Sequence, residues 1–265
     1  MKGERIGEGR TAEIFAWGDG QVLKLYYSGF PRQSPEDELA RVQAVRAAGI
    51  HTPAALDVIT LDDRYGVLFE RVRGRMMWEV IQAQPLQLRT FIQLFATLHA
   101  DLHQKVSREL PSRHNKLRQD IAAIAEMPEQ IKTTLLAHLD KLPEGEAVCH
   151  GDFHPGNIML TPEGPVIIDW VDGTQGPPLS DVARSSIIMR TVRPGDNLGE
   201  RLLLAFIIAL SRRIYLKQYR KLRPLTTTDL LAWELPVAAA RLSEGLPPDE
   251  TERLITFVRT HLKFP

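Results

Sequence analysis

The sequence predicts an α+β fold with two lobes: a small antiparallel β lobe carrying one helix, then a larger, mainly helical lobe. The first seventy residues consist of short strand-like stretches separated by glycine-containing turns. From about Met76 onward, apolar residues recur at the three- and four-residue spacing of helices. The chain has 265 residues, 43% of them hydrophobic, which suffices for two unequal lobes. We place the lobes at residues 1–70 and 76–265, with a hinge at 71–75.

The N-terminal lobe begins with "RIGEGRTAEIFAWGDGQVLKLYY", which predicts three strands separated by a glycine turn and a Gly-Asp-Gly hairpin. "SPEDELARVQAVRAAGI" predicts a helix. Ser34 is its expected N-cap, Pro35 its first helical residue, Asp37 part of a capping-box variant, and Gly49 its end. "ALDVITLDDRYGVLFERV" predicts two more strands joined by an Asp-Asp-Arg turn.

The C-terminal lobe is predicted to contain six helices, because apolar residues recur with helical spacing in six segments. These segments are "PLQLRTFIQLFATLHADLHQ", "KLRQDIAAIAEM", "EQIKTTLLAHLDKL", "LGERLLLAFIIALSRRIYLKQYRKL", "TTDLLAWELPVAAARL" and "DETERLITFVRTHL".

Composition excludes several functional classes. The 33 basic and 33 acidic residues cancel, so no global charge attracts nucleic acid or an anionic membrane. Cys149 is the only cysteine, which rules out an intrachain disulfide and favours a reducing compartment. The longest apolar run, residues 202–210, is too short to span a bilayer, and the N-terminus lacks a secretion signal. We expect a cytoplasmic protein without nucleic-acid or membrane partners; the oligomeric state is left open.

One segment concentrates polar groups, "VCHGDFHPGNIMLTPEGPVIIDW" at residues 148–170. "IML" and "PVII" predict a strand pair around the turn "TPEG", which brings Asn157 and Asp169 to neighbouring strand ends. Their amide and carboxylate oxygens are suitable ligands for Mg²⁺, which completes its shell with substrate phosphates and water. Asp152 remains to orient an attacking hydroxyl and accept its proton. These parts predict phosphoryl transfer.

The N-terminal lobe contributes the remaining parts. "GEGRTAEI", residues 7–14, is a glycine turn between strands and is suited to covering phosphates with backbone N–H groups. Lys24 is a lone charge in the apolar strand "VLKLYY" and can neutralise phosphates if an acid holds it. Glu38, on the following helix, is the first candidate for that acid and Glu36 the second.

The order of these motifs resembles the signature set of the protein kinases. The residues within the motifs differ from those of protein kinases. "HGDFHPGN" and "IIDW" stand in place of the kinase motifs, and Ala12 stands in place of the third loop glycine. These variants resemble the aminoglycoside phosphotransferase and choline kinase family, which has a protein-kinase-like fold. The resemblance extends from about Ile6 to Arg184.

The resemblance implies an ATP- and Mg²⁺-dependent small-molecule kinase, with ATP between the lobes and a small hydroxylated molecule as acceptor. Asp181 matches a family aspartate that is expected to hydrogen-bond the catalytic loop without touching the substrate. The implied site comprises the base Asp152, the metal ligands Asn157 and Asp169, and the nucleotide-binding residues Gly7, Gly9, Lys24, Glu38, Phe69, Glu70 and Val72.

Three other functions compete with this interpretation. A protein kinase needs an activation loop, but only twelve positions separate Asp169 from Asp181 and no "APE" follows. A non-catalytic nucleotide-binding module is usually marked by loss of the key polar residues, which are all present here. A metal-dependent hydrolase built on "HGDFH" lacks further ligands, so His150 is interpreted as structural, and His154 is left as a possible substrate contact. His99 and His103, four residues apart, are interpreted as packed or solvated.

The acceptor is not identified by these motifs. Residues 175–265 contain 14 Lys/Arg against 9 Asp/Glu. A pocket for a polycation should be rich in carboxylates, so the count argues against an aminoglycoside acceptor. Glu234, within an apolar helix, is the acid most expected to face inward, where it could contact the acceptor or pair with Arg241.

Overall fold

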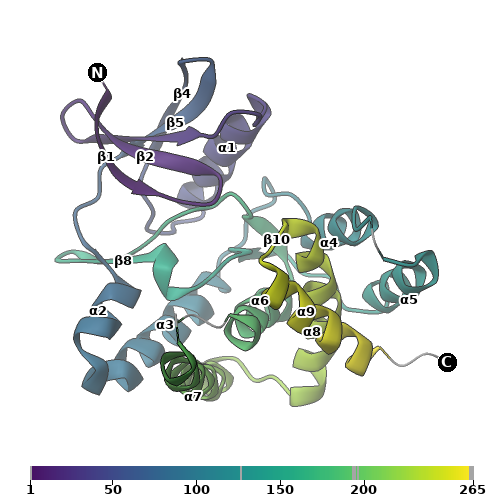
Figure 1. Cartoon of the computed structure of the whole chain (residues 1–265). Coiled ribbons are helices and arrows are strands. Elements are labelled where there is room, and N and C mark those ends of the chain that lie inside the picture. The colour runs from purple at the N-terminus through teal and green to yellow at the C-terminus, as the bar shows by residue number, and fades with distance from the viewer. Residues whose placement is uncertain (1, 126, 193–194, 196, 263–265) are drawn as a thin grey trace. The chain divides into compact units, whose positions relative to one another are not determined.

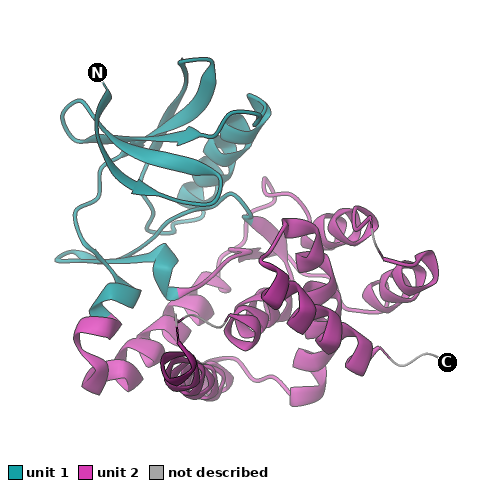
Figure 2. Ribbon diagram, viewed as in Figure 1, with its two compact units in different colours: residues 1–80, 155–173 teal, residues 81–154, 174–265 magenta. Residues whose placement is uncertain are grey.

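The structure, a computed structural model, describes residues 2–125, 127–192, 195 and 197–262. The chain forms two compact units. Unit 1 comprises Met1–Val80 and Pro155–Gly173, and unit 2 comprises Ile81–His154 and Thr174–Pro265 (Figure 2). The hinge expected at residues 71–75 stays a prediction.

Unit 1 is built on a five-stranded antiparallel sheet with the strand order β1-β2-β3-β5-β4 (Figure 1). Asp62 and Asp63 both have positive φ angles, of 50° and 57°, which suits the tight turn between the last two strands. Phe15, Leu23 and Leu25 form its buried apolar cluster. The five predicted strands are confirmed as β1 (Lys2–Glu8), β2 (Ala12–Trp17), β3 (Gln21–Tyr26), β4 (Ala55–Leu61) and β5 (Arg64–Glu70).

The helix of unit 1, α1 (Gln33–Ala47), begins earlier than predicted. Arg32 already has helical backbone angles and is the cap residue, so Ser34 lies inside the first turn and caps nothing. The predicted capping box is therefore wrong; the Gln33 side-chain amide donates to Asp37 Oδ1 at 2.6 Å instead. At the other end Gly49 has φ 79°, as expected of a helix terminator.

A second, three-stranded sheet in unit 1 has the order β6-β8-β9. β6 (Arg75–Met76) precedes helix α2 (Met77–Ala83), which the sequence did not predict. The short helix η2 (Pro155–Asn157) leads into β8 (Ile158–Thr161), which pairs antiparallel with β9 (Gly164–Ile167). This is the predicted strand pair around "TPEG".

Unit 2 is mainly helical, as predicted. Its small sheet pairs β7 (Ala147–Cys149) with β10 (Thr174–Gly176). Cys149 is fully buried. Among the described residues, no helix combines the length and apolar character needed to cross a lipid bilayer. The helices are η1 (Pro85–Gln87), α3 (Leu88–Leu102), α4 (Arg113–Ala122), α5 (Glu129–Leu139), α6 (Pro178–Thr191), α7 (Leu198–Leu222), α8 (Thr227–Ala240), η3 (Arg241–Glu244) and α9 (Pro248–His261).

Helix α6 was not predicted from the sequence, although it contacts α7, α8 and α9. Its buried residues include Ser180, Asp181, Arg184 and Ser186 as well as apolar ones. A helix that is buried on most sides has no separate polar face. Its sequence therefore lacks the regular recurrence of apolar and polar residues that identifies a surface helix.

Candidate functional site

The loop after β7 holds Asp152 in a defined conformation. Gly151 has φ 82°, a left-handed conformation that glycine adopts without the steric penalty of a side chain. The backbone N–H of Asp152 donates to His150 Nδ1 at 3.2 Å. His150 is buried and, as predicted, serves this loop through a hydrogen bond.

Asp181, on α6, anchors the same loop. Its Oδ2 accepts from the backbone N–H of His150 at 2.6 Å, and its Oδ1 accepts from that of Gly151 at 2.9 Å. These are the hydrogen bonds that the sequence predicted for Asp181. The carboxylate is fully buried. Burial alone raises its pKa, but hydrogen bonds from His103 and His99 outweigh burial and hold the pKa well below the usual range.

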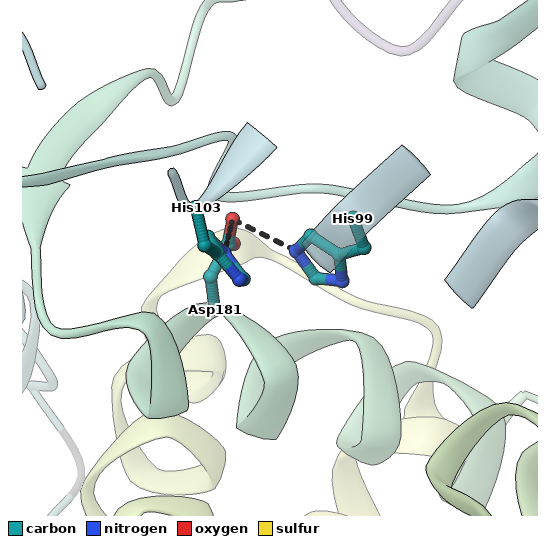
Figure 3. A group of neighbouring side chains, drawn as sticks. All are labelled: His99, His103 and Asp181. Atoms are coloured by element: carbon teal, nitrogen blue, oxygen red, sulfur yellow. Dashed lines mark hydrogen bonds and ion pairs between the residues drawn. The ribbon is translucent and has the colours of Figure 1, made fainter. Parts of the chain in front are cut away.

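His99, on α3, and His103, which directly follows the last residue of α3, also converge on Asp181 (Figure 3). Their Nε2 atoms lie 3.1 and 3.4 Å from Asp181 Oδ2. A carboxylate only accepts, so each Nε2 carries the proton and each Nδ1 accepts, from Tyr215 and Tyr219 respectively, both at 2.7 Å. The three residues could geometrically hold a metal ion, but both nitrogens of each ring are already engaged. The two histidines are packed in the core, as one of the two predicted alternatives stated.

Burial also fixes the charge state of this pair. It lowers the pKa of His99 to about 3, against the opposing influence of Asp181. The pKa of His103 is lowered for the same reason. Both rings are therefore neutral near pH 7, and Asp181 is the charged member of the network.

Asp152 is flanked by two basic side chains within unit 2. Arg184 Nη2 donates to its Oδ1 at 3.3 Å, and His154 Nε2 lies 3.4 Å from its Oδ2. Burial raises the pKa of Asp152, but His154 and Arg184 together outweigh burial and hold the pKa below its ordinary value. The side chain is 32% exposed. The site therefore presents an ionised, partly accessible carboxylate.

Lys24 is the centre of the polar cluster in unit 1. It lies on β3, the middle strand of the five-stranded sheet, and not on an edge strand. Its ammonium donates to Glu38 Oε1 at 2.7 Å and to Asp169 Oδ1 at 2.8 Å. Tyr26 donates to the other Glu38 oxygen at 2.6 Å. Glu36, the second candidate partner, pairs with Arg32 instead.

The charge of Lys24 is strongly favoured in this cluster. Burial lowers the pKa of the ammonium, but the nearby carboxylates of Glu38 and Asp169 outweigh burial and raise the pKa far above the usual range. A permanently charged lysine, held from one side by a buried glutamate, is suited to binding phosphate oxygens.

Asn157 and Asp169 lie at the same end of the β8–β9 hairpin. Asn157 directly precedes β8, and its backbone C=O accepts from the N–H of Ile168 at 3.0 Å. Asp169 follows β9 with φ 66°, a conformation that is strained for a residue other than glycine and is common at functional sites. One amide and one partly exposed carboxylate are hard oxygen donors and fit the ligand preference of Mg²⁺.

The model of the phosphotransferase enzyme family (APH) matches residues 2–225, most of the chain. The chain belongs to this family. The enzyme class predicted from the sequence, a small-molecule kinase, is confirmed at this level. No curated protein matches the sequence.

Solved aminoglycoside phosphotransferases share the fold of this phosphotransferase. A thermostable mutant of APH(4)-Ia in its apo form has a TM-score of 0.65 and 17% identity, covering 97% of this chain and 94% of that one. The APH(3'')-Id of Streptomyces rimosus, in complex with ADP and streptomycin, has a TM-score of 0.58 and 21% identity, with coverage of 88% and 91%. These proteins have a protein-kinase-like fold, so the predicted fold class is confirmed.

The other predicted nucleotide-binding residues of the phosphotransferase lie in and beside the five-stranded sheet. Gly7 is on β1, and Gly9 is in the turn before β2, where its N–H donates to Ala12 at 2.8 Å. Phe69 and Glu70 end β5, and Val72 lies in the segment that follows. Their roles in nucleotide binding stay predictions.

Sequence reasoning missed Arg184 as a neighbour of Asp152. The available signal was its position three residues after Asp181, because helical neighbours at this spacing share a face. Asp181 faces the loop that carries Asp152, so Arg184 faces it too. Without recognition of α6 as a helix, that spacing had no structural meaning.

Proposed function

We propose that this phosphotransferase transfers the γ-phosphoryl group of ATP to a hydroxyl group of a small molecule, with Mg²⁺ as cofactor and Asp152 as base. The observation that carries the proposal is the buried Lys24 held between Glu38 and Asp169 in unit 1. A solved APH(4)-Ia complex with AMP-PNP and hygromycin B, with a TM-score of 0.66, 16% identity and coverage of 97% and 93%, is consistent with a nucleoside triphosphate as donor.

In this proposal unit 1 binds the nucleotide phosphates. Lys24 contributes a fixed positive charge, and its partner Glu38 holds it in place. The turn after β1, which contains Gly9 and follows Gly7, would cover the phosphates with backbone N–H groups other than that of Gly9, which donates to Ala12. Asn157 and Asp169 would hold Mg²⁺, which would offset the negative charge that develops during phosphoryl transfer.

Asp152 in unit 2 acts on the acceptor. A new bond forms between the acceptor hydroxyl oxygen and the γ-phosphorus as the bond to the β–γ bridging oxygen breaks, and ADP leaves. The hydroxyl proton passes to Asp152, which is ionised and able to receive it. In a loose transition state, orientation of the hydroxyl contributes more than removal of its proton.

Two rival functions fit the observations less well. A protein kinase requires a long segment after the metal-binding aspartate, whereas here β10 begins at Thr174, five residues after Asp169. A non-catalytic nucleotide-binding module requires no base. Here Asp152 stands on a loop fixed by Asp181, with basic neighbours that favour its ionised form.

We further propose that the acceptor is less cationic than an aminoglycoside. Polycation binding needs carboxylates whose charge is available. Glu234 is buried and paired with Arg212 at 2.9 Å and Arg190 at 3.4 Å, so the pairing with Arg241, one of the two roles that the sequence left open for it, is not formed. Arg241 instead pairs with Glu250 at 2.6 Å. Asp196, another acid of residues 175–265, lies outside the described residues.

Asp152→Asn tests the central proposal. We expect turnover to fall by about 10²–10⁴-fold, the usual contribution of a general base, while the Kd of Mg·ATP stays unchanged. ADP release is followed with a panel of hydroxylated metabolites, and the Kd is measured calorimetrically. Asp140→Asn, which alters an exposed carboxylate paired with Arg118, is the matched control. Near-normal turnover of Asp152→Asn contradicts the assignment of the base.

A further inference from the structure

We propose that Arg184 is a positioning residue for Asp152, and that Glu244, near the C-terminus, holds Arg184 in that role. The inference rests on the proposed function of Asp152 as base. It assigns to the region after residue 225, beyond the match to the family model, a direct part in arranging the catalytic loop.

The contacts form a chain of three side chains within unit 2. Arg184 Nη2 donates to Asp152 Oδ1 at 3.3 Å and to Glu244 Oε2 at 3.2 Å, and its Nη1 donates to Glu244 Oε1. The Arg184 side chain is only 8% exposed. A planar guanidinium that is engaged by one carboxylate through both terminal nitrogens has little freedom, so its position next to Asp152 is fixed.

This arrangement restricts the Asp152 side chain on both sides. Arg184 contacts Oδ1 while His154 lies near Oδ2, so rotation of the carboxylate would lose one contact or both. In the proposed reaction one of these carboxylate oxygens accepts a hydrogen bond from the acceptor hydroxyl. The reaction depends on the position of that oxygen, because a displacement of about 1 Å can lower the rate by about 10²-fold.

Glu244 is itself supported by its surroundings. It ends η3, the short helix between α8 and α9, where Arg241 Nη1 lies 3.8 Å from its Oε2. Arg241 also pairs with Glu250, which accepts from Thr191 on α6 at 2.8 Å. The C-terminal segment is thereby tied to the middle of α6, at Arg184, and to its last residue, Thr191, so the position of Arg184 depends on that segment.

A comparable ion pair elsewhere in unit 2 provides the control. Arg212 on α7 donates to Glu234 at 2.9 Å and to Ser186 at 2.7 Å. It is a partly buried arginine held by a buried glutamate, and among the described residues its hydrogen bonds go to Glu234 and Ser186 and not to Asp152. If Arg184 only stabilised the fold, its removal and that of Arg212 would affect turnover alike.

The experiment compares Arg184→Ala, Arg184→Lys, Glu244→Gln and Arg212→Ala with the wild type and Asp152→Asn. The probe is Mg·ATP, first with water as phosphoryl acceptor and then with the metabolite panel, read as ADP release. For Arg184→Ala we expect turnover to fall by about 10–100-fold, with an unchanged Kd for Mg·ATP. Arg184→Lys should turn over faster than Arg184→Ala, because lysine supplies the positive charge but lacks the two terminal nitrogens of the guanidinium group. Added guanidinium ion restores activity to Arg184→Ala and not to Asp152→Asn.

The outcomes separate the two levels of the proposal. If the wild type releases no more ADP than Asp152→Asn, the proposed function fails and the inference with it. If Asp152→Asn is impaired while Arg184→Ala turns over like the wild type, the function stands and the inference is overturned. Loss of turnover in Arg212→Ala equal to that in Arg184→Ala, at similar Tm, also overturns it. Should Arg184→Ala fail to fold, Glu244→Gln decides: we expect a several-fold loss of turnover, and an unchanged rate refutes the role of Glu244.

Discussion

Replacing Asp181 with asparagine should destabilise unit 2 more than the same aspartate-to-asparagine replacement at the surface of the protein. The carboxylate accepts from four donors: the backbone N–H groups of His150 and Gly151, and the Nε2–H groups of His99 and His103. An asparagine has one acceptor oxygen and one NH₂ group. In either orientation the NH₂ group therefore faces at least one backbone N–H of the loop.

The magnitude follows from these four hydrogen bonds. A buried donor left without an acceptor costs about 1–3 kcal/mol. The remaining bonds lose their charge-assisted character, at about 1 kcal/mol each, since bonds to charged groups are roughly twice as strong. Easier desolvation of a neutral amide offsets part of this loss. We expect a net decrease of at least about 2 kcal/mol in the free energy of unfolding, a large share of the 5–15 kcal/mol typical of a domain.

Urea unfolding of the wild type and of Asp181→Asn measures this difference. With a slope of about 2 kcal/mol per molar urea, the midpoint should fall by about 1 M. Asp140→Asn, at an exposed ion pair, should stay within about 0.5 kcal/mol of the wild type. A decrease below about 1 kcal/mol for Asp181→Asn, well under the expected lower limit, would show that the loop does not depend on this anchor.

Three further outcomes are expected. Stability should fall as the pH drops from about 6.5 towards 3, because His99 is neutral in the folded state and becomes protonated on unfolding; the slope is about 1.4 kcal/mol per pH unit, and His103 adds to it. Urea midpoints between pH 7 and 4 measure this pH dependence of stability, and His99→Gln should make stability depend less on pH. A wild-type stability that does not change with pH contradicts the prediction. Asp169→Ala should weaken Mg·ATP binding more than Asn157→Ala, because only Asp169 brings a full negative charge; calorimetry that finds both affinities undiminished places the metal elsewhere. Kanamycin-like and gentamicin-like compounds should be poor acceptors, and a steady-state kcat/KM above about 10⁴ M⁻¹s⁻¹ would refute the proposed acceptor class.

The strand pattern of unit 1 was predictable because its signals are local. The glycine and aspartate turns between short apolar runs determine where each strand ends. Lys24 was predictable as a buried charge because its neighbours in "VLKLYY" are apolar on both faces of the strand, which is typical of a central strand. Its partner Glu38 was also found from sequence, as the acid on the next helix. The start of that helix was not, because the turn at Pro31–Ser34 competes with the predicted cap.

The core of unit 2 was less predictable because its contacts join residues far apart in sequence. His99 on α3 contacts Tyr215 on α7, and His103, directly after α3, contacts Tyr219 on α7. Each histidine is 116 residues from its tyrosine. The two histidines are four residues apart, and so are the two tyrosines, a spacing that by itself is equally consistent with a solvated helix face. Only the packing of α3 against α7 turns the two pairs into one network.

The acids of the C-terminal region show how linear counting and structure lead to the same expectation for different reasons. The count gave 14 basic against 9 acidic residues, which says nothing about where the acids lie. In the structure Glu234 and Glu244 are each held by arginines, so these carboxylates stabilise helix packing and the loop of Asp152. To pair with Glu234 or Glu244, a cationic acceptor would have to displace an arginine from its carboxylate partner, which leaves a charge uncompensated at a cost of several kcal/mol. A neutral hydroxylated acceptor makes no such demand, and this difference is the physical basis of the proposed acceptor class.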